Sequence, residues 1–292
     1  MEALINFFDH VPTSFRTGLL LGGIVFFWIL EGFLPLFKFK YKKIRHGALN
    51  MFFNLTTAIV GFGLAGALLW ASDFTYSNKI GLLHIVELPL WGQVIIGILL
   101  LDLIGAYFIH WLEHKVKWMW KFHLVHHSDT TIDVTSGLRH HPGETVFRIF
   151  FTICAVMIVG APMGIVMLYQ SLSVLFAHIT HANLNMPAKV DKILSFVFIT
   201  PNMHKVHHHY QQPLTDTNFG NIFSFWDRMF RTFAEVENTK ALIYGIDTHM
   251  EAKENDNIGN LLAIPFQKYR VPLGSKFGET KIMEEVKLNA QK

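Results

Sequence analysis

Residues 88–114 read LPLWGQVIIGILLLDLIGAYFIHWLEH, an apolar run that ends in two histidines four residues apart. A helix needs about 20 predominantly apolar residues to cross the hydrocarbon core of a bilayer. Within 88–109 the only charged residue is Asp102. The run therefore predicts a membrane-spanning helix that places His110 and His114 at one of its ends.

Three further apolar stretches surround this run, at about 15–37, 51–71 and 146–177. The last of them is interrupted by Gly160-Ala161-Pro162, which predicts a helical hairpin that turns at the proline and dips into or just across the bilayer. We expect an all-α, polytopic membrane protein. It would have about four transmembrane or hairpin segments and a cytoplasmic, histidine-rich helical cap.

The composition agrees with a membrane protein and excludes other classes. Of the 292 residues, 51% are apolar and only 16% are charged, whereas soluble proteins carry about 25% charged residues. The net charge of +3 is too small to suggest binding of nucleic acid. The single cysteine, Cys154, excludes a disulfide within the chain and a cysteine-based metal site.

Five basic residues lie within 38–45, directly after the first apolar stretch. The positive-inside rule places this loop in the cytoplasm, so the run at 88–109 returns to the cytoplasm at His110. We expect N-terminal transmembrane helices over 1–109, a di-metal catalytic region over 110–235 that includes the hairpin, and a cytoplasmic tail over 236–292.

Histidine is unusually frequent, with 17 residues, and most of them form three clusters. The clusters are His110 with His114, His123 with His126 and His127, and His204 with His207 and His208. Residues three or four apart share one face of a helix, so each cluster can direct its imidazoles to one point. A single cluster could equally be solvated, but three on one predicted membrane side favour a metal site. Eight nitrogens suit two ions rather than one.

The series H-x3-H, H-x2-H-H, H-x2-H-H resembles the fatty acid hydroxylase/sterol desaturase superfamily of membrane-bound histidine-box di-iron oxygenases, in its bacterial-type members. The resemblance covers about 102–232 and includes the segments 120–128, 139–144, 181–183, 200–208 and 218–228. One departure is Trp111, where many relatives have arginine, but this is not a ligand position.

The resemblance implies two Fe ions as cofactors, with O2 as co-substrate; by ligand type alone zinc would be equally acceptable. The implied ligands are His110, His114, His123, His126, His127, His181, His204, His207 and His208, with His141 and His178 as either ligands or neighbours. We expect His140 and His209 to support the ligands or to be exposed, and His10, His46, His84 and His249 to be ordinary histidines.

Two acids are expected to support the site. Asp102 either orients a ligand imidazole or forms a hydrogen bond that packs helices. Glu144 is expected to pair with Arg139 near the pocket. Glu113, in contrast, is expected to be solvated or paired with Lys117.

The resemblance implies a membrane-bound oxidoreductase that hydroxylates or desaturates a lipid, sterol or fatty-acyl substrate drawn from the bilayer. The chain has no C-x-x-C-H motif and no cysteine cluster, so we expect an external electron donor, a ferredoxin or a cytochrome b5-type protein. We expect a bacterial inner membrane, with the metal site on the cytoplasmic side.

The alternatives are a membrane metal transporter or sensor and a non-catalytic, zinc-bound scaffold that binds lipid. A transport path would place ligands midway along the spans. Here the histidines gather at one edge, and the stretches 15–37 and 51–71 contain none, which favours an enzyme.

Overall fold

The computed structural model describes residues 1–38 and 40–275, and its regular structure is helical. Over these residues there is no named β-strand, and only three isolated β-bridges occur. The predicted all-α fold is therefore confirmed. Residues 276–292 of the predicted tail lie outside the described part of the chain.

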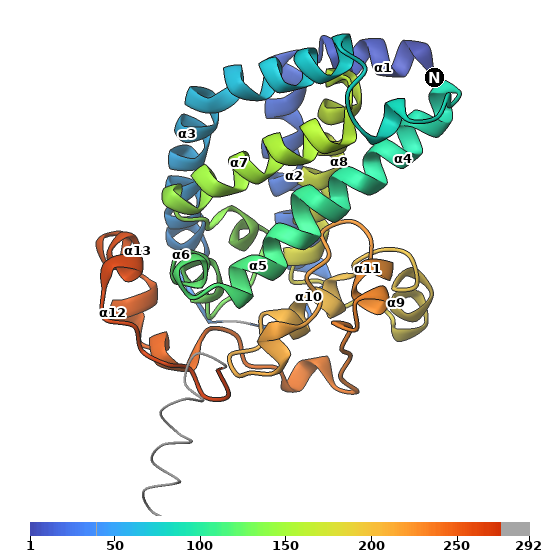
Figure 1. Ribbon diagram of the computed structural model, residues 1–292. Helices are drawn as coiled ribbons and strands as arrows, with labels where there is room; N and C mark the ends of the chain where they lie inside the picture. Colours follow the sequence, from blue (N-terminus) through green and yellow to red (C-terminus); the bar gives the residue numbers. More distant parts are fainter. Residues whose placement is uncertain (39, 276–292) are drawn as a thin grey trace, which may run out of the picture.

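The helices up to residue 115, together with α7 and α8, form a bundle in the upper part of Figure 1. They are α1 (Glu2–Asp9), α2 (Thr13–Phe33), α3 (Lys43–Ser77), η1 (Leu82–His84), α4 (Leu90–Asp102), the π-helical turn η2 (Leu103–Phe108), α5 (Ile109–Lys115), α7 (Pro142–Val159) and α8 (Met163–His181).

Shorter helices gather at the lower end of the bundle in Figure 1. They are α6 (Lys117–His127), η3 (Val134–Leu138), α9 (Ala188–Leu194), α10 (Pro201–His207), η4 (Leu214–Asp216), α11 (Phe225–Met229), η5 (Thr239–Ala241), η6 (Asp247–His249), α12 (Ala252–Asn255), α13 (Ile258–Ala263) and η7 (Ile264–Phe266).

Five segments are long and apolar enough to cross a membrane: α2, α3 with η1, α4 through α5, α7 and α8. The hairpin predicted at 146–177 is confirmed as two helices of 18 and 19 residues, each of which qualifies by itself. Gly160 ends α7 in the left-handed region at φ 71°, and Pro162 immediately precedes α8. The four predicted apolar stretches thus correspond to five candidate helices, because the hairpin contributes two of them.

The bundle core lies where α4, α7 and α8 meet, around the buried side chains of Leu101, Val156 and Ile165. Helix α3 runs along α7, and α1 and α2 pack against α8. Helix α3 has 35 residues and is therefore about 52 Å long, well beyond the hydrocarbon thickness of about 30 Å. Its first turns consequently belong to the histidine-rich end of the molecule.

The described residues after 236, up to 275, pack in part against this end of the molecule. Leu261 and Ile264 pack with Trp120 and Leu124 of α6 and with Phe53 of α3 in one buried cluster. Trp120 is thus a core residue. The segment from α12 to η7 covers α6 from the outside.

The basic loop lies at the same end of the bundle as the histidines. The Tyr41 hydroxyl donates to the Asp133 carboxylate at 2.6 Å, and the Glu31 carboxylate at the end of α2 accepts from the Val134 and Asn183 backbone N–H groups at 2.7 and 2.8 Å. These bonds tie the 34–42 loop region to η3 and to the end of α8. That this end faces the cytoplasm stays a prediction.

Candidate metal centre

Nine buried histidines form two separate groups. The first contains His110 and His114 of α5, His123 and His127 of α6, and His207 of α10. The second contains His126, His181, His204 and His208, from α6, the end of α8, and α10 with its cap. Within each group, one ring nitrogen from every member lies within 4.8 Å of the others.

The nitrogen spacing suits a bound ion. In the second group, the His181 Nε2 lies 2.9 Å from that of His204 and 3.3 Å from that of His126. In the first group, the Nε2 atoms of His110 and His123 are 3.1 Å apart. Two nitrogens bound to one ion at about 2.0–2.1 Å lie about 2.9–3.4 Å apart for right-angled and tetrahedral geometry.

In five of the nine histidines the opposite ring nitrogen contacts an oxygen acceptor, as is usual for metal ligands. The Nδ1 contacts are His110 to the Phe219 carbonyl at 2.9 Å, His114 to Asp216 at 3.2 Å, His123 to Glu144 at 2.9 Å, His207 to the Thr217 carbonyl at 2.7 Å and His181 to the Ala177 carbonyl at 2.8 Å. An Nδ1–H donated to oxygen leaves the Nε2 lone pair free.

Several of the inward nitrogens have no other partner. The Nε2 atoms of His114 and His207 and both ring nitrogens of His127 are buried without a hydrogen bond. A buried polar atom without a partner is costly, and a metal ion would satisfy one nitrogen on each of these three rings. The residues present therefore fit two metal ions, one in each group.

Burial keeps these imidazoles neutral, which is the form that binds metal. Desolvation lowers the pKa of His123 to about 3, although the Glu144 carboxylate opposes that shift. Desolvation, reinforced by the neighbouring imidazoles, holds the pKa values of His126, His127 and His204 well below the usual range.

A buried network of charges lies behind the first group. One oxygen of Glu144 accepts from His123, from His140 and from Arg148, each at 2.9 Å. Arg148 also pairs with Glu113, which is fully buried. The expectation of an exposed Glu113 was wrong, because Arg148 from the neighbouring helix neutralises it inside the bundle.

Arg139 is not the partner that was expected for Glu144. Its Nε donates to the Asn50 side chain at 2.8 Å and lies 3.7 Å from Asp129. His46, expected to be ordinary, is buried there as well, 2.9 Å from Asp129 and 3.2 Å from Asp133. These residues form a polar cluster between α3 and the segment after α6.

Asp102 contacts a loop instead of an imidazole. Its carboxylate accepts from the Ile222 and Phe223 backbone N–H groups, each at 3.3 Å, and from the Trp226 indole at 3.1 Å. The same loop carries Phe219, whose carbonyl accepts from His110. Asp102 thus braces the loop that orients His110, and its bonds are those of the packing alternative.

His141 and His178 lie outside both groups. His141 accepts from the Gly143 N–H at 2.9 Å at the start of α7, and its Nε2 lies 3.2 Å from the Leu262 carbonyl. The His178 ring packs beside Phe27 of α2. His140 is closer to the site than these two, since its ring stacks on that of His126 with centroids 4.4 Å apart.

A cavity of 280 Å³ opens beside the two groups, between η2, α7 and α8. His110 and His123 line it from the first group, and His126, His181 and His204 from the second. On the outer face of η2 an apolar groove of 450 Å³ is lined by Leu103, Ile104, Tyr107, Phe108, Trp111 and Phe230.

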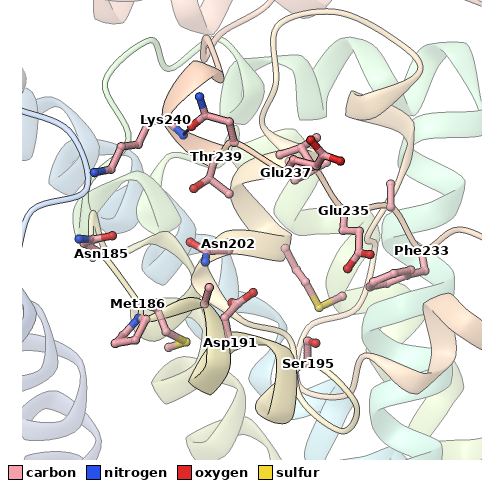
Figure 2. A pocket seen from close by; sticks show the side chains of 17 residues that line it. Asn185, Met186, Asp191, Ser195, Asn202, Phe233, Glu235, Glu237, Thr239 and Lys240 are labelled. Atoms are coloured by element: carbon pink, nitrogen blue, oxygen red, sulfur yellow. Dashed lines mark hydrogen bonds between the residues drawn. The ribbon is translucent and has the colours of Figure 1, made fainter.

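Another hollow, of 350 Å³, lies among α9, α10 and residues 233–240. Figure 2 shows Asn202 of α10 and Asp191 of α9 on its wall, with Glu235 nearby. Met203 and Val206 line it as well, whereas His204 and His207 belong to the metal groups. Helix α10 therefore separates this hollow from the metal centre.

Comparison with known proteins identifies the class to which this arrangement belongs. The sequence model of one family, described as fatty acid hydroxylase, matches residues 94–232. This segment holds every histidine of the two groups. Over this segment the chain matches the fatty acid hydroxylase family, as the order of its histidine clusters indicated.

Among characterised proteins, the chain is similar to the ornithine lipid hydroxylase OlsE of Rhizobium tropici, with 29% identity over 50% of this chain and 43% of that protein. It is 31% identical to an alkylglycerol monooxygenase of Caenorhabditis elegans, over 55% of this chain and 30% of that protein. It is also 31% identical to cholesterol 25-hydroxylase-like protein 1, member 2 of Danio rerio, over 52% of this chain and 54% of that protein. The matches thus span about half or less of these relatives, and no solved structure matches the chain.

Proposed function

We propose that this protein is a membrane-bound oxidoreductase that uses O2 to hydroxylate a lipid at a histidine-held di-iron centre. The observation that carries the proposal is the pair of buried histidine groups beside one cavity. The names of the similar proteins, which include hydroxylases of an ornithine lipid and of cholesterol, support a lipid substrate.

When bound, the iron centre would supply the oxidation of a C–H bond by O2 and two electrons. The reaction consumes a lipid C–H bond, O2, two electrons and two protons, and yields an alcohol and water. The residues of the chain position the metal ligands. Asp216, Glu144 and the carbonyl of Phe219 fix the Nδ1 atoms of three ligands, so that their Nε2 atoms face inward before the metal arrives.

The cavity would receive the part of the lipid that reacts. It has small residues on several sides, including Gly105, Ala106 and Ala177, which leave room for a substrate next to the imidazoles. The groove on the outer face of η2 suits an acyl chain, because six apolar or aromatic side chains line it at the level of a candidate span. The substrate would thus enter from the bilayer.

The two electrons require an external donor, for which we propose a ferredoxin or a cytochrome b5-type protein. The basic loop at 38–45 lies at the histidine end of the bundle and offers such an acidic partner a docking surface. Purified protein in lipid nanodiscs, supplied with chemical reductant alone, should turn over far more slowly than with a protein donor. Equal turnover rates with chemical reductant and with a protein donor would show that no protein donor is required. We place the centre on the cytoplasmic side of a bacterial inner membrane.

Metal analysis by mass spectrometry tests the centre. We expect about two irons per chain in the purified protein, and loss of metal in His126→Ala/His207→Ala, which removes one ligand from each group. His10→Ala, a change at an exposed histidine of the end of α1, is the matched control and should keep both ions.

Oxygen transfer tests the activity separately. Isotopically labelled O2 should deliver one labelled oxygen atom to a lipid of the host membrane, and the double variant should abolish this. Metal that is bound without any labelled lipid would instead favour the transporter, sensor or scaffold alternatives.

A further inference from the structure

The cavity beside the histidines has a polar wall, although the helices around it are apolar enough to cross a membrane. Gln170 and Ser173 of α8, Thr152 of α7 and Asn221 all line it. Polar side chains within a membrane helix are costly unless they find hydrogen-bond partners. Their presence on this wall therefore calls for a partner, either in the protein or in the ligand.

Most of these side chains are satisfied within the protein. The Asn221 amide donates to the Ser173 hydroxyl at 2.8 Å, and the Thr152 hydroxyl donates to a backbone carbonyl one turn earlier at 2.9 Å. Gln170 is the exception on this wall: over the described residues its amide forms no hydrogen bond. It offers two donor hydrogens and one acceptor to the contents of the cavity.

The size of the cavity limits what enters it. Pockets that enclose a complete drug-sized ligand measure roughly 300–1,000 Å³, and this one has 280 Å³. Only a part of a lipid fits. A terminal hydrocarbon segment would leave the Gln170 amide without a partner, whereas an oxygen-bearing segment would satisfy it.

We propose that the cavity binds a hydrogen-bonding oxygen of the lipid substrate, as a hydroxyl, ether or ester, and that Gln170 is the residue that selects it. The oxidised carbon then lies close to that oxygen and far from the end of the hydrocarbon tail. The inference rests on the proposed function, because that function assigns the cavity to the substrate.

Photolabelling in nanodiscs tests this without turnover, under argon and with no reductant. Two probes are 1-O-hexadecylglycerol analogues, one with a diazirine next to the ether oxygen and the other with a diazirine at the end of the chain. Peptide mass spectrometry locates the labels. We expect the first probe to label the cavity wall on α8, around Ser173, and the second to label outside it.

Gln170→Met keeps the length of the side chain and removes its ability to form hydrogen bonds. It should reduce cavity labelling by the ether-end probe about fivefold to tenfold, the loss expected for one neutral hydrogen bond. Ser171→Ala changes the next residue, whose hydroxyl bonds within its own helix and which does not line the cavity. It should leave the labelling unchanged.

Three results would overturn the proposal: equal labelling of the cavity by the tail-end probe, no effect of Gln170→Met, or no cavity labelling by either probe. A different result would refute the proposed function. Selective labelling of the cavity together with no transfer of labelled O2 would retain the polar-wall assignment and refute the hydroxylase.

Discussion

Replacing Asp216 by asparagine should weaken one metal group and spare the other. One Asp216 oxygen accepts from His114 Nδ1 at 3.2 Å, and the other accepts from Lys115 Nζ at 2.9 Å. The His114 side chain is fully buried and that of Asp216 is 11% exposed, so water screens this pair little. The variant keeps the shape of the side chain and removes its charge.

The expected loss follows from the change in bond type. A hydrogen bond to a charged group contributes about 1.5–3 kcal/mol, and a neutral one about 0.5–1.5 kcal/mol. The difference of about 1–1.5 kcal/mol corresponds to about a tenfold weaker affinity for the ion of the first group. This is the lower limit of the 10–100-fold effect that is typical for residues that orient metal ligands.

Chelator competition with metal analysis measures the effect. In the variant, one ion should leave at about a tenfold lower chelator concentration, and the second should leave as in the parent protein, since no second-group histidine contacts Asp216. Asp191→Asn, which removes a carboxylate on the other side of α10, should behave like the parent. Unchanged affinity for both ions, or simultaneous loss of both with the fold intact, would refute the assignment of His114 to a separate ion.

Three further changes test the fold. Gly160→Val should lower the free energy of unfolding by at least about 1–2 kcal/mol in thermal melts, because Gly160 has φ 71° and L side chains avoid that region; an unchanged melting temperature would contradict this turn. Glu31→Ala should lower the free energy of unfolding by at least about 2 kcal/mol, because it leaves the Val134 and Asn183 N–H groups without an acceptor. Glu31→Gln retains an acceptor and should lower it less. Equal effects of the two variants would argue against these hydrogen bonds. In metal-stripped protein, burial lowers the folded-state pKa of His123 from 6.5 to about 3, so its contribution to stability is complete above about pH 6.5 and is lost as the pH falls towards 3. Melting temperatures measured from pH 7.5 downward should fall, and a rise would be inconsistent with buried neutral imidazoles.

Periodicity made the helices and the three histidine clusters predictable, since both depend on neighbours within one or two turns. The division of the histidines into a group of five and a group of four was not predictable. His126 and His127 are adjacent in the chain but belong to different groups, because successive residues on a helix point in directions about 100° apart. Only the positions of α5, α8 and α10 determine which group each residue joins.

The residues that orient the ligands were harder to find. Glu113 and Arg148 are 35 positions apart, and the carbonyls of Phe219 and Thr217 belong to residues whose type carries no signal. One local clue existed for Arg148, which follows Glu144 by four residues and therefore shares its helix face. A similar clue existed for His141, since the proline after it marks the start of a helix, where a side chain that caps the backbone is expected.

The ligands come from four helices that the ribosome makes in succession. His110 and His114 emerge first, whereas His204, His207 and His208 follow the last candidate span. When synthesis has reached only the end of α6, the set of histidine nitrogens is still incomplete for both ions. Each ion can acquire its full set only once α7 and α8 have entered the bilayer and α10 has folded back, so metal loading should be a late event in biogenesis. Cells that run short of the metal should accumulate inserted, metal-free protein rather than chains arrested before insertion.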